Sequence, residues 1–211
     1  MSRIVPEKIV DPSTEEKIKA SARIVFHQKG YAATRTRDIA EAAGINLALL
    51  NYYFRSKEKL FDLIMLETMQ QFMQAAMGVI NDTSSTLDQK IRILVSNYID
   101  LLIAEPDIPL FIMSEIKRDP QQLLNRMGLK DGFMQSVLVR QLEERAAHYG
   151  NTNFKHPLQF LMNLLGLTIF PFIANPLLRG ISKVSQSKFN EMMLERKKLI
   201  PIWIENMLAH S

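Results

Sequence analysis

The residues best suited to chemistry lie in one segment, 36–57, and that chemistry is hydrogen bonding to nucleic acid. Apolar residues at helical spacing in its second half leave Asn46, Ala48, Asn51 and Tyr52 on the opposite face. The major groove of DNA accommodates one α-helix, and amide and hydroxyl groups can hydrogen-bond to base edges and phosphates there. The segment therefore predicts a helix that enters the major groove.

A turn and a set of apolar residues would position that helix. Two helices that cross tightly need a small residue where they touch, and Ala40 stands at that place. Gly44 permits the positive φ that a sharp turn requires. Apolar contacts that fix the crossing angle come from Ile39, Ala43, Ile45, Leu50 and Phe54. This is the pattern of a helix-turn-helix.

Enzyme chemistry has weaker support. The chain contains no cysteine, which excludes disulfides, thiolate metal sites and cysteine nucleophiles. It has no Gly-x-Ser-x-Gly, P-loop or Gly-x-Gly-x-x-Gly motif, so we expect no cofactor. Glu144 and His148 are four residues apart and could form half a metal site, but His27, His156 and His210 supply no second pair. A surface ion pair or a helix-end histidine is the simpler interpretation, and we expect no bound metal and no catalysis.

The charge is unevenly distributed along the 211 residues, of which 47% are hydrophobic and 23% charged. The first 60 residues hold eleven basic and seven acidic side chains, whereas the remainder holds fifteen of each. The shares of hydrophobic and charged residues in the whole chain are typical of a globular protein with a sizeable core. A basic module joined to a neutral one suggests an end that binds a polyanion, although solvated basic faces are common.

No segment has the properties of a signal or a membrane span. Residues 1–13 are polar and contain Pro6 and Pro12, unlike a secretory signal. The most apolar run, Leu158–Ile173, is shorter than the roughly 20 residues that a bilayer requires and has polar interruptions. We expect a cytoplasmic protein without membrane contact.

Helical periodicity throughout, with almost no strand signal, predicts an all-α fold of about nine helices. Gly30 should stop the first helix, Asn46 and Ser56 should cap later ones, and Pro201 should kink the last. We expect helices over about residues 13–29, 36–43, 47–54, 57–80, 87–102, 108–116, 121–149 (broken near its two glycines), 157–173 and 188–208.

Short runs in the first third of the chain resemble the TetR family of bacterial transcriptional repressors. They are Gly30–Thr34, Arg37–Gly44, Tyr52–Phe54 and Ser56–Leu60. The resemblance covers about residues 14–72, which is the family's whole DNA-binding domain, and the combination of runs is highly specific.

The resemblance implies three parts and a dimer. It places an N-terminal arm at 1–13, a helix-turn-helix domain at 14–56 with the start of the fourth helix to about 72, and a ligand-binding and dimerisation domain at 57–211. The last two long helices would form a four-helix bundle across a two-fold axis. Candidate interface residues are Leu161, Leu164, Leu165, Met193, Ile200, Trp203 and Ile204. Sequence alone does not separate interface from pocket here.

The resemblance also implies roles in DNA binding. Thr36 and Arg37 match positions that contact phosphate and sometimes bases, Tyr52 and Tyr53 match positions that touch the backbone, and Lys57 matches a phosphate-binding lysine. Core packing of the tyrosines and simple solvation of the two cations are the alternatives. The complete set expected at the DNA is Thr36, Arg37, Asn46, Leu47, Ala48, Asn51, Tyr52, Tyr53 and Lys57.

The chain departs from the family at 46–51. Many members have Ser-Lys-Gly-Thr-Leu-Tyr there, whereas this chain has Asn-Leu-Ala-Leu-Leu-Asn. Leu49 cannot supply a threonine hydroxyl to phosphate, and Asn51 could instead hydrogen-bond to an adenine edge. The operator of a relative therefore cannot be transferred to this chain.

A methionine stripe marks the start of the expected sensor. Met65, Met69, Met73 and Met77 are spaced by four and share one helix face. Flexible methionines could line an adaptable apolar pocket, and core packing is the alternative. Further pocket candidates, with the few polar groups that a pocket needs, are Phe111, Met113, Phe133, Met134, Met162, Phe170, Asn97, Tyr98, Asn163 and Thr168.

These features predict a homodimeric repressor that binds a palindromic operator. Its two recognition helices would lie about 34–36 Å apart, and a small hydrophobic effector would release it. A helical scaffold or ligand-binding protein that keeps the motif without using DNA, and a metal-dependent helical-bundle enzyme, are the alternatives.

Overall fold

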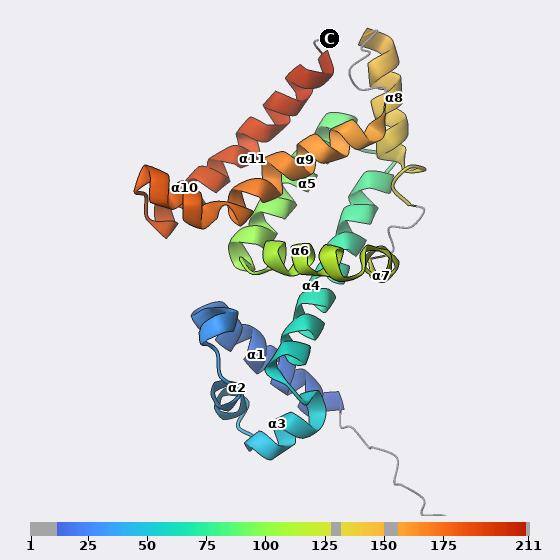
Figure 1. Ribbon diagram of the computed structural model, residues 1–211. Helices are drawn as coiled ribbons and strands as arrows, with labels where there is room; N and C mark the ends of the chain where they lie inside the picture. The colour runs from blue at the N-terminus through green and yellow to red at the C-terminus, as the bar shows by residue number, and fades with distance from the viewer. Residues whose placement is uncertain (1–11, 128–131, 150–155, 210–211) are drawn as a thin grey trace, which may run out of the picture. The chain divides into compact units, whose positions relative to one another are not determined.

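Helices are the regular elements of the computed structural model, which describes residues 12–127, 132–149 and 156–209 (Figure 1). There is no strand among these residues, so the all-α prediction is confirmed. The described helices number eleven rather than about nine. In chain order they are α1 (Pro12–Ala33), α2 (Thr36–Ala42), α3 (Leu47–Phe54), α4 (Lys57–Asn81), α5 (Leu87–Ala104), α6 (Ile108–Arg118), α7 (Pro120–Arg126), α8 (Val137–Tyr149), α9 (Pro157–Ile173), α10 (Asn175–Ser182) and α11 (Gln186–Ala209).

Two segments account for the larger number. The segment 121–149 contains α7 and α8 as separate helices, and α10 was not expected at all. Pro176 and Gly180 suggest a loop in the sequence, but a proline in the first turn of a helix removes no helical hydrogen bond. Gly30 interrupts α1 as expected, with φ 72°, and a short turn to Ala33 follows it.

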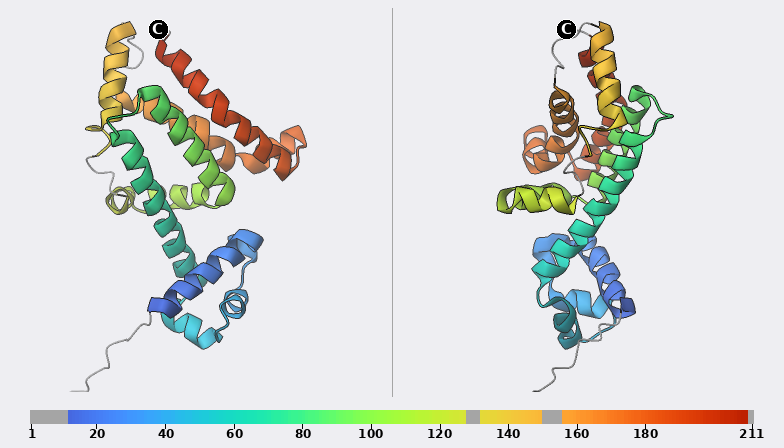
Figure 2. Two further views of the ribbon diagram at one scale, coloured as in Figure 1. Left: turned by 180° about the vertical axis from the view of Figure 1, so that it is seen from behind. Right: turned by 90° about the vertical axis from the view of Figure 1, so that its right-hand side faces the viewer.

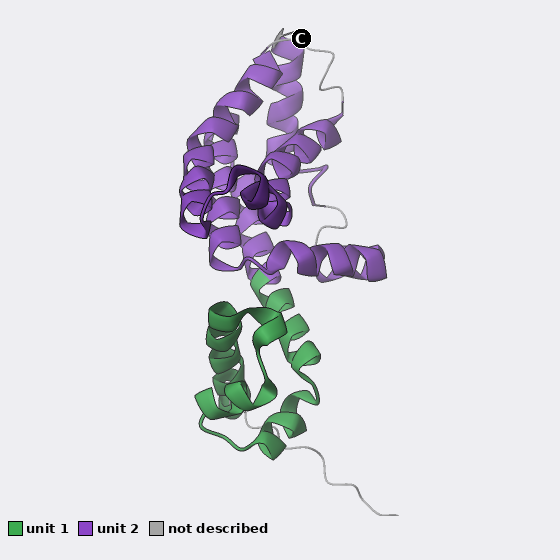
Figure 3. Cartoon of the chain, turned by 60° about the vertical axis from the view of Figure 1, so that its left-hand side comes forward, with its two compact units in different colours: residues 1–68 green, residues 69–211 purple. Residues whose placement is uncertain are grey.

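The chain divides into two compact units within α4 (Figure 3). Unit 1 ends at Thr68 and unit 2 begins at Met69. Most of the expected N-terminal arm, residues 1–11, lies outside the described residues.

The core of unit 1 comes from one stripe of α1 and the buried faces of α2, α3 and α4. Ile18 and Ala22 are fully buried, and the Phe26 ring meets the edge of Phe61 at 5.1 Å. Beside this core, the Lys19 ammonium lies 2.8 Å from a Glu67 carboxylate oxygen, and an Arg23 nitrogen lies 3.1 Å from the other. These two ion pairs join α1 to the first half of α4.

In unit 2, α5 packs against α9 and α11, which lie side by side (Figure 2). Ile91, Val95 and Ile99 fill the inner face of α5. The buried Lys90 ammonium donates to the carbonyl oxygens of Asp82 and Ser85 at 2.5 and 2.7 Å, which fixes the α4–α5 loop.

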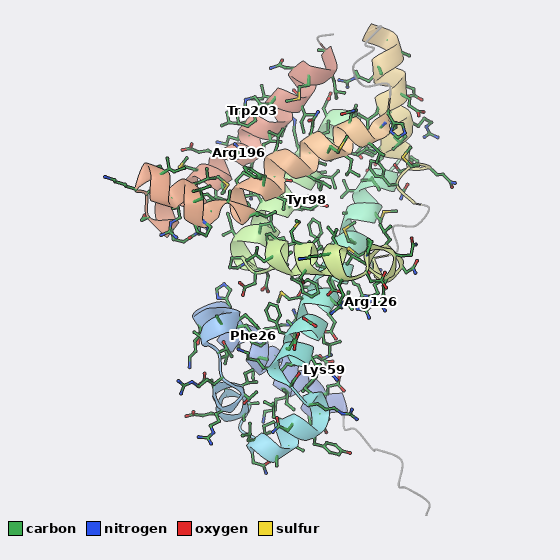
Figure 4. The ribbon with its side chains drawn as sticks, in the orientation of Figure 1. Phe26, Lys59, Tyr98, Arg126, Arg196 and Trp203 are labelled. Carbon is green, nitrogen blue, oxygen red and sulfur yellow. The ribbon has the colours of Figure 1, made fainter. Side chains whose placement is uncertain are left out.

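A proline inside α9 is compensated from α11. Pro171 has no N–H, so the carbonyl oxygen of Leu167 lacks its helical donor. Arg196 Nη2 donates to this oxygen at 2.8 Å, and the guanidinium lies 5.0 Å from the centre of the Trp203 ring (Figure 4). Burial lowers the pKa of Arg196. The helix α11 itself runs through Pro201 to Ala209.

Among the described helices, none by itself has both the length and the apolar character needed to cross a bilayer. Only α9 and α10 taken together pass that criterion, and the pair is bent by 66°.

Candidate nucleic-acid interface

The turn between α2 and α3 has the geometry that the sequence predicted. Gly44 has φ 63°, and the Ile45 N–H donates to the carbonyl oxygen of Ala40 at 3.0 Å. Ala40 and Ala43 are buried where the helices meet. A larger residue at Ala40 would separate the helices, so the small side chain sets their close approach.

The start of α3 is fixed by Asn46. Its Oδ1 accepts a hydrogen bond from the Leu49 N–H at 2.8 Å, which confirms the expected N-cap. At the other end, Ser56 Oγ accepts from the Lys59 N–H at 3.2 Å and begins α4. The start of the recognition helix α3 and the start of α4 are therefore each fixed by a local hydrogen bond.

The helix α3 has one buried face and one accessible face. Leu50 is fully buried and Phe54 nearly so, whereas Asn51 is exposed and Tyr52 is 42% exposed. Asn46 and Ala48 are also exposed, and Leu47, Leu49 and Tyr53 are half-buried. Tyr52 and Tyr53 pack edge to face at 5.5 Å. Phe54 belongs to the core, as expected, and the polar side chains of α3 are accessible to a partner.

The first turn of α2 is held by Asp38. Its Oδ2 accepts from the Arg35 N–H at 2.9 Å and lies 3.2 Å from the Lys29 ammonium. The backbone hydrogen bond from Arg35 and the charge of Lys29 lower the pKa of Asp38. This turn carries the half-buried Thr36 and the exposed Arg37.

Lys57 has a structural role that the sequence did not indicate. Its ammonium donates to the carbonyl oxygens of Tyr31 and Thr34 at 2.7 and 2.9 Å and lies 4.2 Å from the centre of the Tyr31 ring. These bonds close the α1–α2 loop onto the first turn of α4. The phosphate contact expected of Lys57 stays a prediction.

The expected pocket residues do not form one group. Met69 and Phe111 are buried in unit 2, Met73 and Phe133 are half-buried, and Tyr98 packs against Phe72 at 4.5 Å. Met65 is buried in unit 1, because the stripe on α4 continues through the division of the chain. Burial raises the pKa of Tyr98 to about 12.

Several other pocket candidates are exposed on unit 2, and their role in a pocket stays a prediction. Met162 is 57% exposed. The other exposed candidates are Asn97, Met113, Met134 and Phe170. Two further candidates, Asn163 and Thr168, differ in burial: Asn163 is half-buried, and the buried Thr168 donates to the Leu164 carbonyl oxygen of its own helix.

The expected dimer residues also separate into two groups. Leu164, Met193, Ile200 and Ile204 are buried within one chain, where α5, α9 and α11 pack together, and their place at a dimer interface stays a prediction. Leu161, Leu165 and Trp203 are half-buried. The large exposed apolar side chains of α9 and α11 are Leu158, Met162, Phe170, Met192, Leu194, Leu199, Ile202 and Met207.

Glu144 and His148 line an open pocket of about 580 Å³ between the start of α5 and α8. Asp88 in this pocket pairs with Arg145 at 3.0 Å, and Glu144 lies 4.0 Å from Arg140. Within residues 12–127, 132–149 and 156–209, no three acidic or histidine side chains gather as metal ligands.

The site is that of a helix-turn-helix DNA-binding protein. Residues 18–64 match the family model of "Bacterial regulatory proteins, tetR family". Unit 1 therefore carries the helix-turn-helix domain of this family of regulators, which confirms the resemblance found in the first third of the sequence.

Comparison over the whole chain finds similar proteins and similar folds. The "Probable HTH-type transcriptional regulator YttP" of Bacillus subtilis (strain 168) is 24% identical over 203 residues, covering 92% of this chain and 94% of that protein. Among solved structures, the regulator PfmR of Thermus thermophilus has a TM-score of 0.56 at 20% identity, covering 87% of this chain and 96% of that one. FadR of Bacillus subtilis, solved with stearoyl-CoA, has a TM-score of 0.54 at 17% identity, covering 88% and 96%.

Proposed function

We propose that this regulator is a cytoplasmic, homodimeric repressor that binds a palindromic operator and is released by an effector with a long apolar chain. The accessible face of α3, with Asn51 and Tyr52 exposed on a helix fixed at the Gly44 turn, is the observation that carries this proposal. A helix presented in this way fits the major groove.

The DNA contacts divide by chemistry. The exposed Arg37 and the neighbouring Thr36 suit phosphate oxygens, because both lie in the first turn of α2, which Asp38 holds in place. The carboxamide of Asn51 suits the N6 and N7 groups of adenine, and the Tyr52 hydroxyl suits the backbone.

An effector with an apolar chain is supported by unit 2 and by one neighbour. The interior side chains Met69, Phe72, Phe111 and Tyr98 are apolar or aromatic, and FadR of Bacillus subtilis binds stearoyl-CoA. Methionine and aromatic side chains adapt to a flexible chain at small cost. Release of DNA requires that the effector bind better to a conformation that binds the operator poorly.

The dimer would use the exposed apolar side chains of α9 and α11. Exposure of Met162, Leu199 and Ile202 to water is unfavourable, because these side chains are apolar. A two-fold partner that presents the same helices would cover them.

Duplexes selected from a random library, followed by anisotropy titration, test the proposal. We expect inverted repeats to be selected, and Arg37→Ala to weaken binding and reduce the salt slope by about one. Arg140→Ala on α8, also exposed, is the matched control and should bind as the unmodified protein does. Stearoyl-CoA and shorter acyl-CoA esters are then titrated into the complex, and release should increase with chain length. Selection of no sequence, or equal binding by Arg37→Ala, would contradict the proposal.

A further inference from the structure

The outward side of α11 carries an open groove of mixed character. Glu191, Leu194, Glu195, Lys198 and Leu199 line it, and its volume is about 560 Å³. Leu194 and Leu199 are 47% and 40% exposed there, next to charged side chains of both signs.

The charges near this groove differ in how they are paired within the chain. Lys188 pairs with Glu191 at 2.8 Å, Arg92 pairs with Glu205 at 2.6 Å, and Lys197 pairs with Asp100. Glu195 and Lys198 form no ion pair with any residue that the structure describes, although they are three positions apart on one helix. A spacing of three normally favours such a pair. Glu195 interacts with Lys188 only at longer range, where its charge helps to raise the pKa of Lys188. The side chains of Glu195 and Lys198 therefore remain available to a partner.

Further apolar side chains are exposed on α11 and on α9, which packs against it. Ile202 follows on α11, and Met162 is exposed on the neighbouring α9. A partner that fits must therefore cover apolar side chains and at the same time offer one acid and one base. A second copy of the same surface offers both, since a two-fold axis brings each face against itself.

We infer that Glu195 and Lys198 make this surface recognise its own copy, each acid facing the base of the other subunit. The inference rests on the proposed dimer, and it adds that these two charges determine which partner the surface binds. Because each contact occurs twice across the axis, a change of one charge acts twice. Such pairs influence partner choice more than they influence affinity, because a wrong partner brings like charges together.

Opposite charge reversals test this pairing in the full-length protein. Lys198→Glu leaves this part of the groove acidic, and Glu195→Lys leaves it basic. We expect each variant alone to dimerise about tenfold or more weakly in sedimentation equilibrium, with partial recovery in high salt, because like charges then face each other. An equimolar mixture should form heterodimers with an affinity close to that of the unmodified protein, whichever register the helices adopt.

Lys117→Glu on α6 and Glu143→Lys on α8 are matched controls, since both side chains are exposed and belong to other helices. They should leave the dimer unchanged and show no preference for each other. Circular dichroism of every variant establishes that it is folded. If the single reversals dimerise normally, or the mixture shows no preference for heterodimers, the charge pairing is wrong while the dimer itself stands. If the unmodified protein is a monomer that binds its operator, the proposed function fails instead.

Discussion

Arg196 supplies the carbonyl oxygen of Leu167 with the hydrogen bond that Pro171 withholds from it. Both partners are half-buried in unit 2, and the guanidinium is also packed on Trp203. The contact joins α9 to α11, because the guanidinium of α11 bonds to the carbonyl oxygen of α9 that lacks a helical donor.

This relationship is testable as a double-mutant cycle. Arg196→Met should lower the free energy of unfolding by about 1 kcal/mol, because a partly buried carbonyl oxygen loses its donor. In a Pro171→Ala background the same substitution should cost less, since the introduced alanine would restore the helical N–H. Urea unfolding of the four proteins measures the coupling, expected at about 1 kcal/mol. Additive effects would show that the two residues act independently.

Lys57→Met tests the closure of the α1–α2 loop. The carbonyl oxygens of Tyr31 and Thr34 lose an ionic donor, so we expect a loss of about 1–3 kcal/mol in urea unfolding. Lys59→Met, on the exposed side of the same turn, is the control and should be nearly neutral (Figure 4). The salt slope of operator binding tests the phosphate role separately: it falls by about one if the ammonium also contacts DNA. Equal stability of the two variants would rule out the closure.

Two glycine-to-alanine substitutions should act with opposite sign. At Gly44, φ 63° is unfavourable for alanine, and the nearest atom to an added Cβ is 3.8 Å away, so the cost of about 1–2 kcal/mol comes from the backbone alone. At Gly78, inside α4 with open space around it, alanine should stabilise by up to about 1 kcal/mol. Thermal unfolding compares them, and a stabilised Gly44→Ala protein would be incompatible with the turn described.

Asn51→Ala tests base recognition. We expect a loss of about 1–3 kcal/mol on the preferred operator and a relaxed preference at one base pair in each half-site, because the carboxamide would no longer distinguish bases. The salt slope should stay unchanged. Repeating the duplex selection with Asn51→Ala, and with Asn125→Ala on α7 as control, gives the answer; an unaltered preference would remove Asn51 from the interface.

Tyr98→Phe should change how stability depends on pH. The folded-state pKa of Tyr98 is about 12, above the ordinary value of 10.0, because burial disfavours the phenolate. The folded state therefore holds this proton longer than the unfolded chain does, and its contribution is present below pH 10 and lost as pH rises towards 12. Urea unfolding between about pH 9 and 11 should show a steeper loss for the unmodified protein than for Tyr98→Phe. Identical slopes would mean that Tyr98 titrates alike in both states.

Local features of the site were predictable because they depend on neighbouring residues. The positive φ of Gly44, the cap at Asn46 and the burial of Leu50 each follow from residues within one turn. The accessible face of α3 follows as well, since only its other face is apolar.

Features that depend on distant residues were not predictable. Leu164 and Met162 are both apolar residues of α9, yet one is 3% exposed and the other 57%. The helix α9 is apolar on most sides, so its periodicity does not indicate which side meets α5 and α11. The contacts of Lys57 likewise depend on the position of the α1–α2 loop next to the start of α4. The spacing of residues along the chain does not indicate this position.

Lys57 also connects the first turn of α4 to the backbone just before α2. Its ammonium donates to the carbonyl oxygen of Thr34, two residues before α2 starts. A rotation of the first turn of α4 would therefore displace the α1–α2 loop. Movement of this turn would in this way be transmitted to the start of α2 through Lys57.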